Sequence, residues 1–77
     1  MENIFIRLNG EIRGEILPSY EVLFRTMQDA KLFSELPTDE RIFFDDSSMM
    51  LKEHFCFVYA KRVFYQEKGE KIPYNNN

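Results

Sequence analysis

His54 and Cys56 are the residues of this chain whose types and spacing come closest to a catalytic pair. Two positions apart on a β-strand, they would share one face and supply the minimum of a Cys–His nucleophile pair. No third group that could orient the histidine is evident nearby in the sequence. We therefore expect Cys56 to be a small core residue, His54 to be a surface residue at a strand end, and the protein not to be an enzyme.

Asp45 and Asp46 are the other candidates for chemistry, because together with His54 they could hold a metal ion. Zinc sites use four ligands, with Cys or His at characteristic spacings, and those spacings are missing here. Asp45–Ser48 is better explained as a turn in which side chains cap the backbone. The sequence therefore predicts no catalytic, metal-binding or cofactor-binding residue, and no cofactor.

The chain is small and acidic, with 77 residues, a formal net charge of -3 and an aromatic content of 16%. A chain of this length forms a single domain with a small core, which large rings help to fill. Binding to nucleic acid depends on neutralising phosphates, so the acidic balance argues against it. The single cysteine, Cys56, can form no internal disulfide.

The expected location follows from the absence of targeting signals. The opening residues, MENIFIRL, carry an acidic residue and no long apolar core, so they do not resemble a signal peptide. No segment approaches the roughly 20 apolar residues of a membrane-spanning helix. Abundant Phe, Tyr, Ile, Asn and Lys have AT-rich codons, as in many phages and low-GC bacteria. We expect a cytoplasmic protein without membrane contact, in the host cytoplasm if a phage encodes it.

The stretch NIFIRLNGEIRGEIL, residues 3–17, predicts a β-hairpin around Asn9-Gly10, a pair that favours two-residue turns. A regular two-residue turn would place the apolar residues of the first strand beside charges of the second. Two repairs remain open: a three-residue loop with Leu8 opposite Ile12, or a tight turn with a bulge near Arg13-Gly14. The apolar face would then hold Ile4, Ile6, Leu8, Ile12 and Ile16.

Pro18-Ser19 leads into the predicted main helix, with Ser19 as its N-cap. Between Tyr20 and Phe33 there is no glycine or proline, and apolar residues recur at helical spacing. The sequence therefore predicts an amphipathic helix over Tyr20–Phe33 that packs on the apolar face of the hairpin.

The second half of the chain predicts two further strands and leaves one region open. Arg41–Phe44 has the pattern of a short strand, and Met49–Glu53 that of one helical turn. Phe55–Tyr59 is apolar on both faces and rich in aromatic residues, which favours an interior strand. The alternative is one long helix from Ser48 to Lys68.

These elements predict an α+β fold of the β-grasp type. In it, an N-terminal β-hairpin belongs to a mixed four-stranded sheet, on which one main helix packs. If Ser48–Lys68 forms a C-terminal helix, the order becomes ββαβα instead. We expect one domain over residues 1–67 and a polar, flexible tail over residues 68–77.

The order of elements resembles that of the ubiquitin-like family over residues 3–62. The stretch IFIRLNGEIRGEILPS is similar to the opening hairpin and helix entry of that family, ELPTDERIFFDD to the segment after the helix, and MMLKEHFCFVYAKR to the short turn and last strand. Conjugating members end in Gly-Gly just after the basic residues, whereas this chain continues past Arg62. The resemblance therefore implies a β-grasp fold and a protein-binding surface rather than covalent conjugation.

Members of that family bind partners through the exposed face of the third and last strands. Carried over to this sequence, the resemblance implies a protein-binding patch of Phe43, Phe57 and Tyr59 with Lys61 at its rim. It also implies that Ile42, Cys56 and Val58 face the helix. Exposed aromatic patches are typical of interfaces, although the same residues would suit a second covered face or a homodimer.

We expect a non-enzymatic protein-binding module, such as a small phage or bacterial regulator or inhibitor. It would dock on a larger host protein and block or modulate it. The alternative is a nucleic-acid-binding or nucleoprotein-binding accessory protein that uses a basic and aromatic sheet face. That face would hold Arg7, Arg13, Arg41, Lys61 and Arg62, with Phe5 and Tyr59 for stacking.

Overall fold

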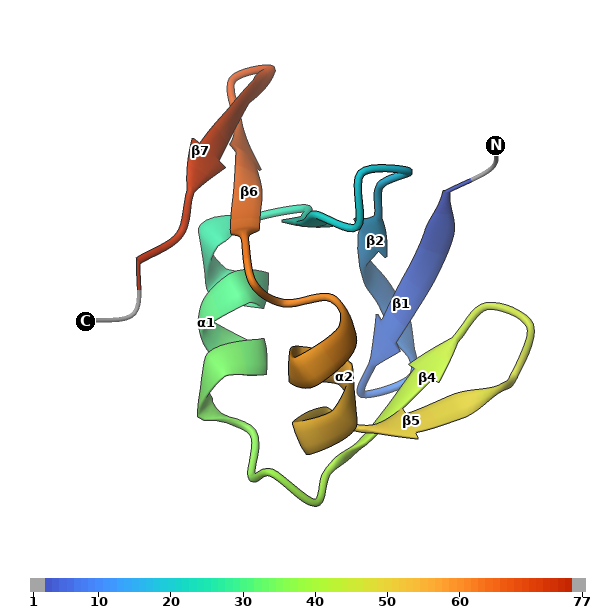
Figure 1. The fold of residues 1–77 in the computed structure, drawn as a ribbon. Coiled ribbons are helices and arrows are strands. Elements are labelled where there is room, and N and C mark those ends of the chain that lie inside the picture. Colours follow the sequence, from blue (N-terminus) through green and yellow to red (C-terminus); the bar gives the residue numbers. More distant parts are fainter. Residues whose placement is uncertain (1–2, 76–77) are drawn as a thin grey trace.

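The computed structural model describes residues 3–75 of the chain (Figure 1). In chain order its elements are β1 (Ile4–Leu8), β2 (Glu11–Ile16), β3 (Val22–Phe24), α1 (Met27–Glu35), β4 (Arg41–Phe44), β5 (Met49–Leu51), α2 (Lys52–Val58), β6 (Val63–Glu67) and β7 (Glu70–Pro73). The α+β class predicted from the sequence is confirmed. The described sheet has seven strands rather than the predicted four.

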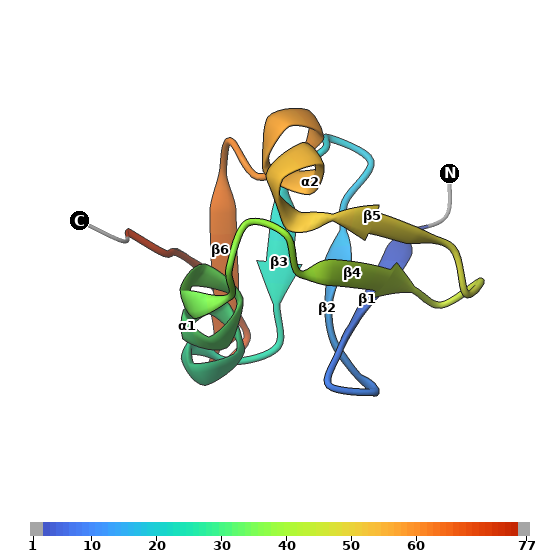
Figure 2. The same cartoon turned by 90° about the horizontal axis from the view of Figure 1, so that it is seen from below.

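The strands form one mixed sheet in the order β5-β4-β1-β2-β3-β6-β7. Neighbouring strands are antiparallel, apart from the parallel pair β3 and β6. Helix α1 packs against β3 and β6, and α2 packs against β4 and β5 (Figures 1 and 2). Both helices cover the same side of the sheet, which we call the inner face. The opposite side is the outer face.

The core lies between the inner face and the two helices, and large rings fill much of it. Phe33 of α1 meets Phe55 of α2 with ring centroids 5.3 Å apart. Phe24 of β3 lies 5.2 Å from Phe33, and Phe44 of β4 lies 6.2 Å from Phe55. Few residues therefore suffice to bury a continuous core in a chain of this length.

The turn of the β1–β2 hairpin is the tight one of the two that the sequence left open. Asn9 and Gly10 both have positive φ, 53° and 80°, as a two-residue type I′ turn requires. Leu8 pairs with Glu11 across the turn. The alternative three-residue loop, with Leu8 opposite Ile12, is therefore wrong.

A bulge in β2 corrects the register, at the position that the sequence indicated. Arg7 pairs with Ile12, whereas Ile6 pairs with Gly14. Arg13 is therefore the extra residue, with no partner of its own in β1. The cause is the side-chain pattern, because without the bulge the buried Ile6 would face a charged residue.

The apolar face of the hairpin is narrower than predicted. Ile4 is 41% exposed at the start of β1. Ile12 is only half-buried, because it precedes the bulge and pairs with Arg7. Its side chain therefore lies on the same face of the sheet as that of Arg7. The hairpin residues of the predicted set that are buried on the inner face are Ile6, Leu8 and Ile16.

The predicted helix over Tyr20–Phe33 is wrong in its first half. Val22–Phe24 forms β3, buried between β2 and β6 in the sheet. A run of three consecutive apolar residues gains burial on both faces of a central strand, which an amphipathic helix could not give it. The helix begins after Thr26, whose side-chain oxygen accepts a 3.1 Å hydrogen bond from the Asp29 amide. Thr26 is therefore the N-cap, rather than Ser19.

Two of the remaining predictions concern the β4–β5 hairpin. The strand predicted over Arg41–Phe44 is confirmed as β4. The helical turn predicted over Met49–Glu53 is wrong at its start, because Met49–Leu51 forms β5 and pairs with β4. Met50 shares the face of its partner Ile42, and Met49 shares the face of its partner Phe43. Apolar side chains therefore lie on both faces of this edge strand.

The predicted interior strand over Phe55–Tyr59 is wrong, because Lys52–Val58 forms α2. Lys52 and Phe55 are the buried residues of this short helix, and their spacing of three positions puts both on the side that faces the core. The alternative of one helix over Ser48–Lys68 is also wrong, because the chain leaves α2 at Tyr59 and enters β6.

Residues 68–77 were predicted to form a polar, flexible tail. The part that the structure describes, residues 68–75, contains the strand β7 instead. Lys68 and Gly69 form a second tight turn with positive φ, 50° and 81°. Strand β7 then pairs with β6. Tyr74 packs beside the core, and its hydroxyl lies 3.2 Å from the Ser34 hydroxyl.

The β-grasp arrangement stays a prediction that this topology does not confirm. In that prediction the last strand lies beside the first. Here β1 lies between β2 and β4, and β4 is antiparallel to it. The last described strands, β6 and β7, lie beside β3 instead.

Candidate functional site

Phe43 lies on the outer face of the sheet, in the middle of β4. Its neighbours Ile42 and Phe44 are buried on the inner face, which leaves the Phe43 side chain 43% exposed. Ile42 therefore faces the helices, as the sequence predicted.

Phe57 and Tyr59 do not join Phe43 in one patch, because their segment is helical. Phe57 is 78% exposed on α2, two positions after the buried Phe55. Tyr59 is half-buried at the end of α2, where its ring packs on Phe55 and on Tyr20 at 5.3 and 5.5 Å. The predicted binding residues therefore divide between the outer face and the helical side of the molecule.

An apolar patch extends from Phe43 over the outer face of β1, β4 and β5. Its side chains, which we call the outer patch, are each 37–45% exposed, and they are Phe5, Phe43, Met49 and Leu51. The strand register makes them neighbours: Phe43 is paired with Met49, and Leu51 with Arg41. Paired residues share a face of the sheet, so these side chains form one surface.

Two arginines border the outer patch. Arg7 is the β1 partner of Phe43, and Arg41 is the β4 partner of Leu51. Among residues 3–75, neither guanidinium has a carboxylate within 4.0 Å, whereas Arg13 and Arg62 both do. The patch therefore has a cationic border whose charge the described chain leaves unpaired.

The other half of the outer face is covered by the chain's own charged side chains. Phe64 of β6 is buried there, because Arg62 and Lys71 lie over its ring at 5.3 and 4.5 Å. Glu21 ties both cations together through ion pairs of 2.8 and 2.9 Å. Hydrogen bonding from Lys71, together with the charges of Lys71 and Arg62, holds the pKa of the Glu21 carboxyl below its usual value. Nothing comparable covers the outer patch in residues 3–75.

The two edge strands of the sheet, β7 and β5, also differ in charge. Strand β7 carries Glu70, Lys71 and Pro73, residues that discourage pairing with another strand. Strand β5 is uncharged. Its backbone bonds to β4 alternate, with the Phe44 amide on the Ser48 carbonyl and the Lys52 amide on the Glu40 carbonyl. This alternation turns the backbone N–H and C=O groups of Met49 toward the open edge.

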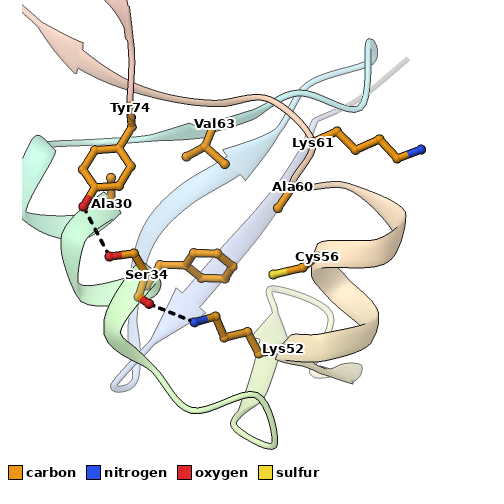
Figure 3. Close-up of a pocket in the computed structure, with 9 residues that line it drawn as sticks. Ala30, Ser34, Lys52, Cys56, Ala60, Lys61, Val63 and Tyr74 are labelled. Atoms are coloured by element: carbon orange, nitrogen blue, oxygen red, sulfur yellow. Dashed lines mark hydrogen bonds between the residues drawn. The ribbon is translucent and has the colours of Figure 1, made fainter. Parts of the chain in front are cut away.

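A pocket of about 280 Å³ lies between α1, α2 and the start of β6 (Figure 3). Apolar side chains form much of its wall, and Ser34 and Tyr74 close one side with their hydroxyl pair. Lys61 stands at the rim, exposed, with its ammonium group extending away from the pocket (Figure 3). The lining residues are Ala30, Phe33, Ser34, Lys52, Cys56, Ala60, Lys61, Val63 and Tyr74.

Lys52 is the buried charge of this pocket, only 9% exposed. Its Nζ atom donates to the carbonyls of Ser34 and Leu36 at 3.1 and 2.5 Å, and lies 5.3 Å from the centre of the Phe33 ring. These carbonyls belong to the last turn and the cap of α1, where no further helical amide can reach them. The lysine at the start of α2 therefore caps the end of α1.

His54 and Cys56 do not form the catalytic pair considered from the sequence. On a helix, residues two positions apart point in different directions. His54 is exposed and stacks on Phe57 with ring centres 6.4 Å apart, whereas Cys56 lines the pocket. Burial raises the pKa of the Cys56 thiol, although the charge of Lys52 partly offsets this. The thiol is therefore protonated at neutral pH and is a weak nucleophile.

Asp45–Ser48 is a capped turn, as the sequence predicted. The Asp46 carboxylate accepts from the amide and the hydroxyl of Ser48 at 2.9 and 2.5 Å. These bonds lower the pKa of the Asp46 carboxyl. Over residues 3–75, no group of three or more Cys, His, Asp and Glu side chains is arranged to hold a metal ion.

Comparisons with protein-family models, with curated proteins and with solved structures give no match for this chain. Within the part of the chain that the structure describes, neither helix has the length and apolar character needed to cross a membrane.

Sequence patterns did not indicate that Met49 and Leu51 belong to the outer patch, nor did they indicate the role of Lys52. Met49, Met50 and Leu51 are three consecutive apolar residues, so no alternation in the sequence separates the exposed Met49 and Leu51 from the more buried Met50. No local pattern could have shown that Lys52 reaches the end of α1, because that contact depends on how the helices pack.

Proposed function

We propose that this protein is a non-enzymatic binding module that docks on a larger protein through the outer patch. The observation that carries the proposal is the contrast within one sheet face. Its β3–β6 half is covered by intramolecular ion pairs over Phe64, whereas its β1–β4–β5 half presents Phe5, Phe43, Met49 and Leu51 to solvent. Exposed apolar side chains that cluster inside a polar border are typical of protein interfaces.

The charge around the outer patch defines the partner surface. Arg7 and Arg41 have no ion-pair partner among the described residues, so a docked protein should supply carboxylates beside an apolar centre. Such complementarity raises the association rate and selects the partner. Binding should therefore weaken as salt screens these charges.

Affinity capture with matched variants tests the proposal. The wild-type protein, the Phe43→Ser/Met49→Ser variant and the Phe57→Ser control are immobilised, and proteins captured from the source organism are compared by quantitative mass spectrometry. Phe57 is the more exposed aromatic residue but lies on α2, outside the outer patch. We expect a protein that wild type and Phe57→Ser retain and the double variant loses.

Two results would contradict this proposal. Equal capture by all three proteins would show that the outer patch does not bind, and loss with Phe57→Ser alone would move the interface to α2. Circular dichroism of each variant shows whether the fold is intact, which exposed substitutions should leave unchanged.

The resemblance to ubiquitin-like proteins supports the proposal only as an expectation that a sheet face binds proteins. A regulatory or inhibitory effect on a host protein, in phage or bacterium, is part of the same proposal. The alternative, nucleic-acid binding, would have to use Arg7, Arg41 and Lys61. The other cations predicted for it are paired, Arg13 with Glu11 and Asp29, and Arg62 with Glu21.

A further inference from the structure

The pocket between the helices contains a buried cation without a buried anion. Lys52 is 9% exposed, and among residues 3–75 no carboxylate lies within 4.0 Å of its Nζ atom. Its two hydrogen bonds go to neutral carbonyls of Ser34 and Leu36. An ammonium group has three N–H donors, so one has no oxygen acceptor in the described chain and only the Phe33 ring, 5.3 Å from Nζ, beside it.

The surroundings of this ammonium group favour one kind of ligand. The pocket volume of about 280 Å³ lies just below the range of ligand sites, roughly 300–1,000 Å³, so only a small ligand fits. Phe33, Ala60 and Val63 give it apolar walls, and Figure 3 shows the Cys56 sulfur directed into the same space. Because that thiol is protonated, it adds no competing negative charge.

We propose that this pocket binds a small carboxylate with a compact apolar body, whose carboxylate accepts the free N–H of Lys52. A charge-assisted hydrogen bond to a buried ammonium is strong, since little water competes for it. The apolar body would lie against Phe33 and Val63. This site is separate from the outer patch and does not depend on the proposed protein-binding function.

The charge of the site argues for a carboxylate rather than a phosphate. Only one buried cation faces the pocket, because the ammonium group of Lys61 extends away from it (Figure 3). A phosphate group carries up to two charges and needs several donors. The hydroxyls in the pocket wall are already engaged, because Ser34 donates to the Lys31 carbonyl and pairs with Tyr74. A single monovalent anion balances the charge of Lys52, and the carbon atoms of the ligand then contact the apolar walls.

Titration with benzoate and its neutral analogue benzamide tests the proposal by nuclear magnetic resonance of the ¹⁵N-labelled protein. We expect saturable shifts for benzoate at the amides of Lys52, Cys56 and Ala60–Val63. Benzamide has almost the same shape but no charge, so it should bind at least about tenfold more weakly. Equal affinities, no shifts at saturating benzoate, or shifts centred on Arg7 and Arg41 would each overturn the proposal.

Two substitutions to methionine provide a matched control. Ala60→Met places a longer side chain in the pocket without touching the Lys52 hydrogen bonds, and should abolish the benzoate shifts. Phe57→Met introduces the same side chain at an exposed position of α2 outside the pocket lining, and should leave the benzoate affinity within about twofold. Retained binding in Ala60→Met, with a spectrum of a folded protein, would overturn the proposal.

Cys56 offers an independent readout because it lines the same pocket. The rate at which the neutral reagent iodoacetamide modifies the thiol should fall severalfold when benzoate saturates the protein. Benzamide at the same concentration should have little effect. An unchanged rate at saturating benzoate would contradict occupancy of the pocket.

Discussion

Gly14 permits a close approach between β2 and β3. A Cβ atom at this position would lie 2.8 Å from a ring carbon of Phe24 and 3.0 Å from the Leu23 carbonyl oxygen. Glycine lets the fully buried Phe24 ring lie close to the backbone of β2. Packing against Phe24, as well as the strand register, therefore favours glycine at position 14, directly after the bulge.

The variant Gly14→Ala should lower the free energy of unfolding by about 1–3 kcal/mol, because the new methyl group must displace a core ring. Urea denaturation followed by circular dichroism measures this. The control is Gly69→Asn: its Cβ meets nothing within 4 Å, and asparagine tolerates the positive φ of this turn. If the two variants lose the same stability, close packing at Gly14 is not the reason for glycine.

Glu21 makes a pH-dependent contribution to stability, because its pKa is lower in the folded chain than the ordinary value of 4.5. A lowered folded pKa stabilises the fold above the unfolded value, and this stability is lost as the pH falls through the folded value. Wild type should therefore lose stability below about pH 4.5 more steeply than Glu21→Gln. Urea midpoints between pH 3 and pH 7 measure the difference. Parallel pH profiles would contradict this assignment.

At the scale of elements, the hairpins followed from local signals more closely than the helices did. Asn9-Gly10 and the alternation around it predicted a hairpin with either a three-residue loop or a tight turn and a bulge, and the structure contains the turn and the bulge. Val22–Phe24 and Phe55–Tyr59 were assigned to the wrong state because short apolar runs fit either strand or helix. Their state depends on tertiary neighbours. Val22–Phe24 is a strand because it pairs with β2 on one side and β6 on the other.

The two helices are joined by Lys52 as well as by their aromatic core. Lys52→Met keeps the apolar stem but removes the donors to two carbonyls at the end of α1, so it should cost about 1–3 kcal/mol of unfolding free energy. Lys61→Met, an exposed substitution in the next connection, should change it by less than about 0.5 kcal/mol. Urea denaturation of both variants measures the difference. Equal stabilities would show that the cap contributes nothing.

At the scale of the whole molecule, the helices cover the inner face and the chain's charged side chains cover part of the outer face. What remains exposed is the outer patch, bordered by Arg7 and Arg41 and ending at the open edge of β5. This asymmetry of one sheet is the basis of the proposed docking surface.

The candidate site could be predicted in part. Phe43 was placed on an exposed sheet face by the resemblance to ubiquitin-like proteins, and the strand Arg41–Phe44 that carries it was predicted from the sequence. Phe57 and Tyr59 were grouped with it through a strand that does not form, and Met49 and Leu51 were missed because β5 was assigned to a helical turn. An interface built from three strands requires the strand order, which short-range patterns do not contain.

The most direct test of the docking surface is the dissociation constant of the captured partner for two single variants, measured by titration calorimetry. Phe43→Ser removes the aromatic centre of the outer patch and should weaken binding at least about tenfold, or about 1.4 kcal/mol. Phe57→Ser removes a more exposed ring on α2 and should change the constant by less than about twofold. The opposite order, with Phe57→Ser weakening binding and Phe43→Ser leaving it unchanged, would contradict the account.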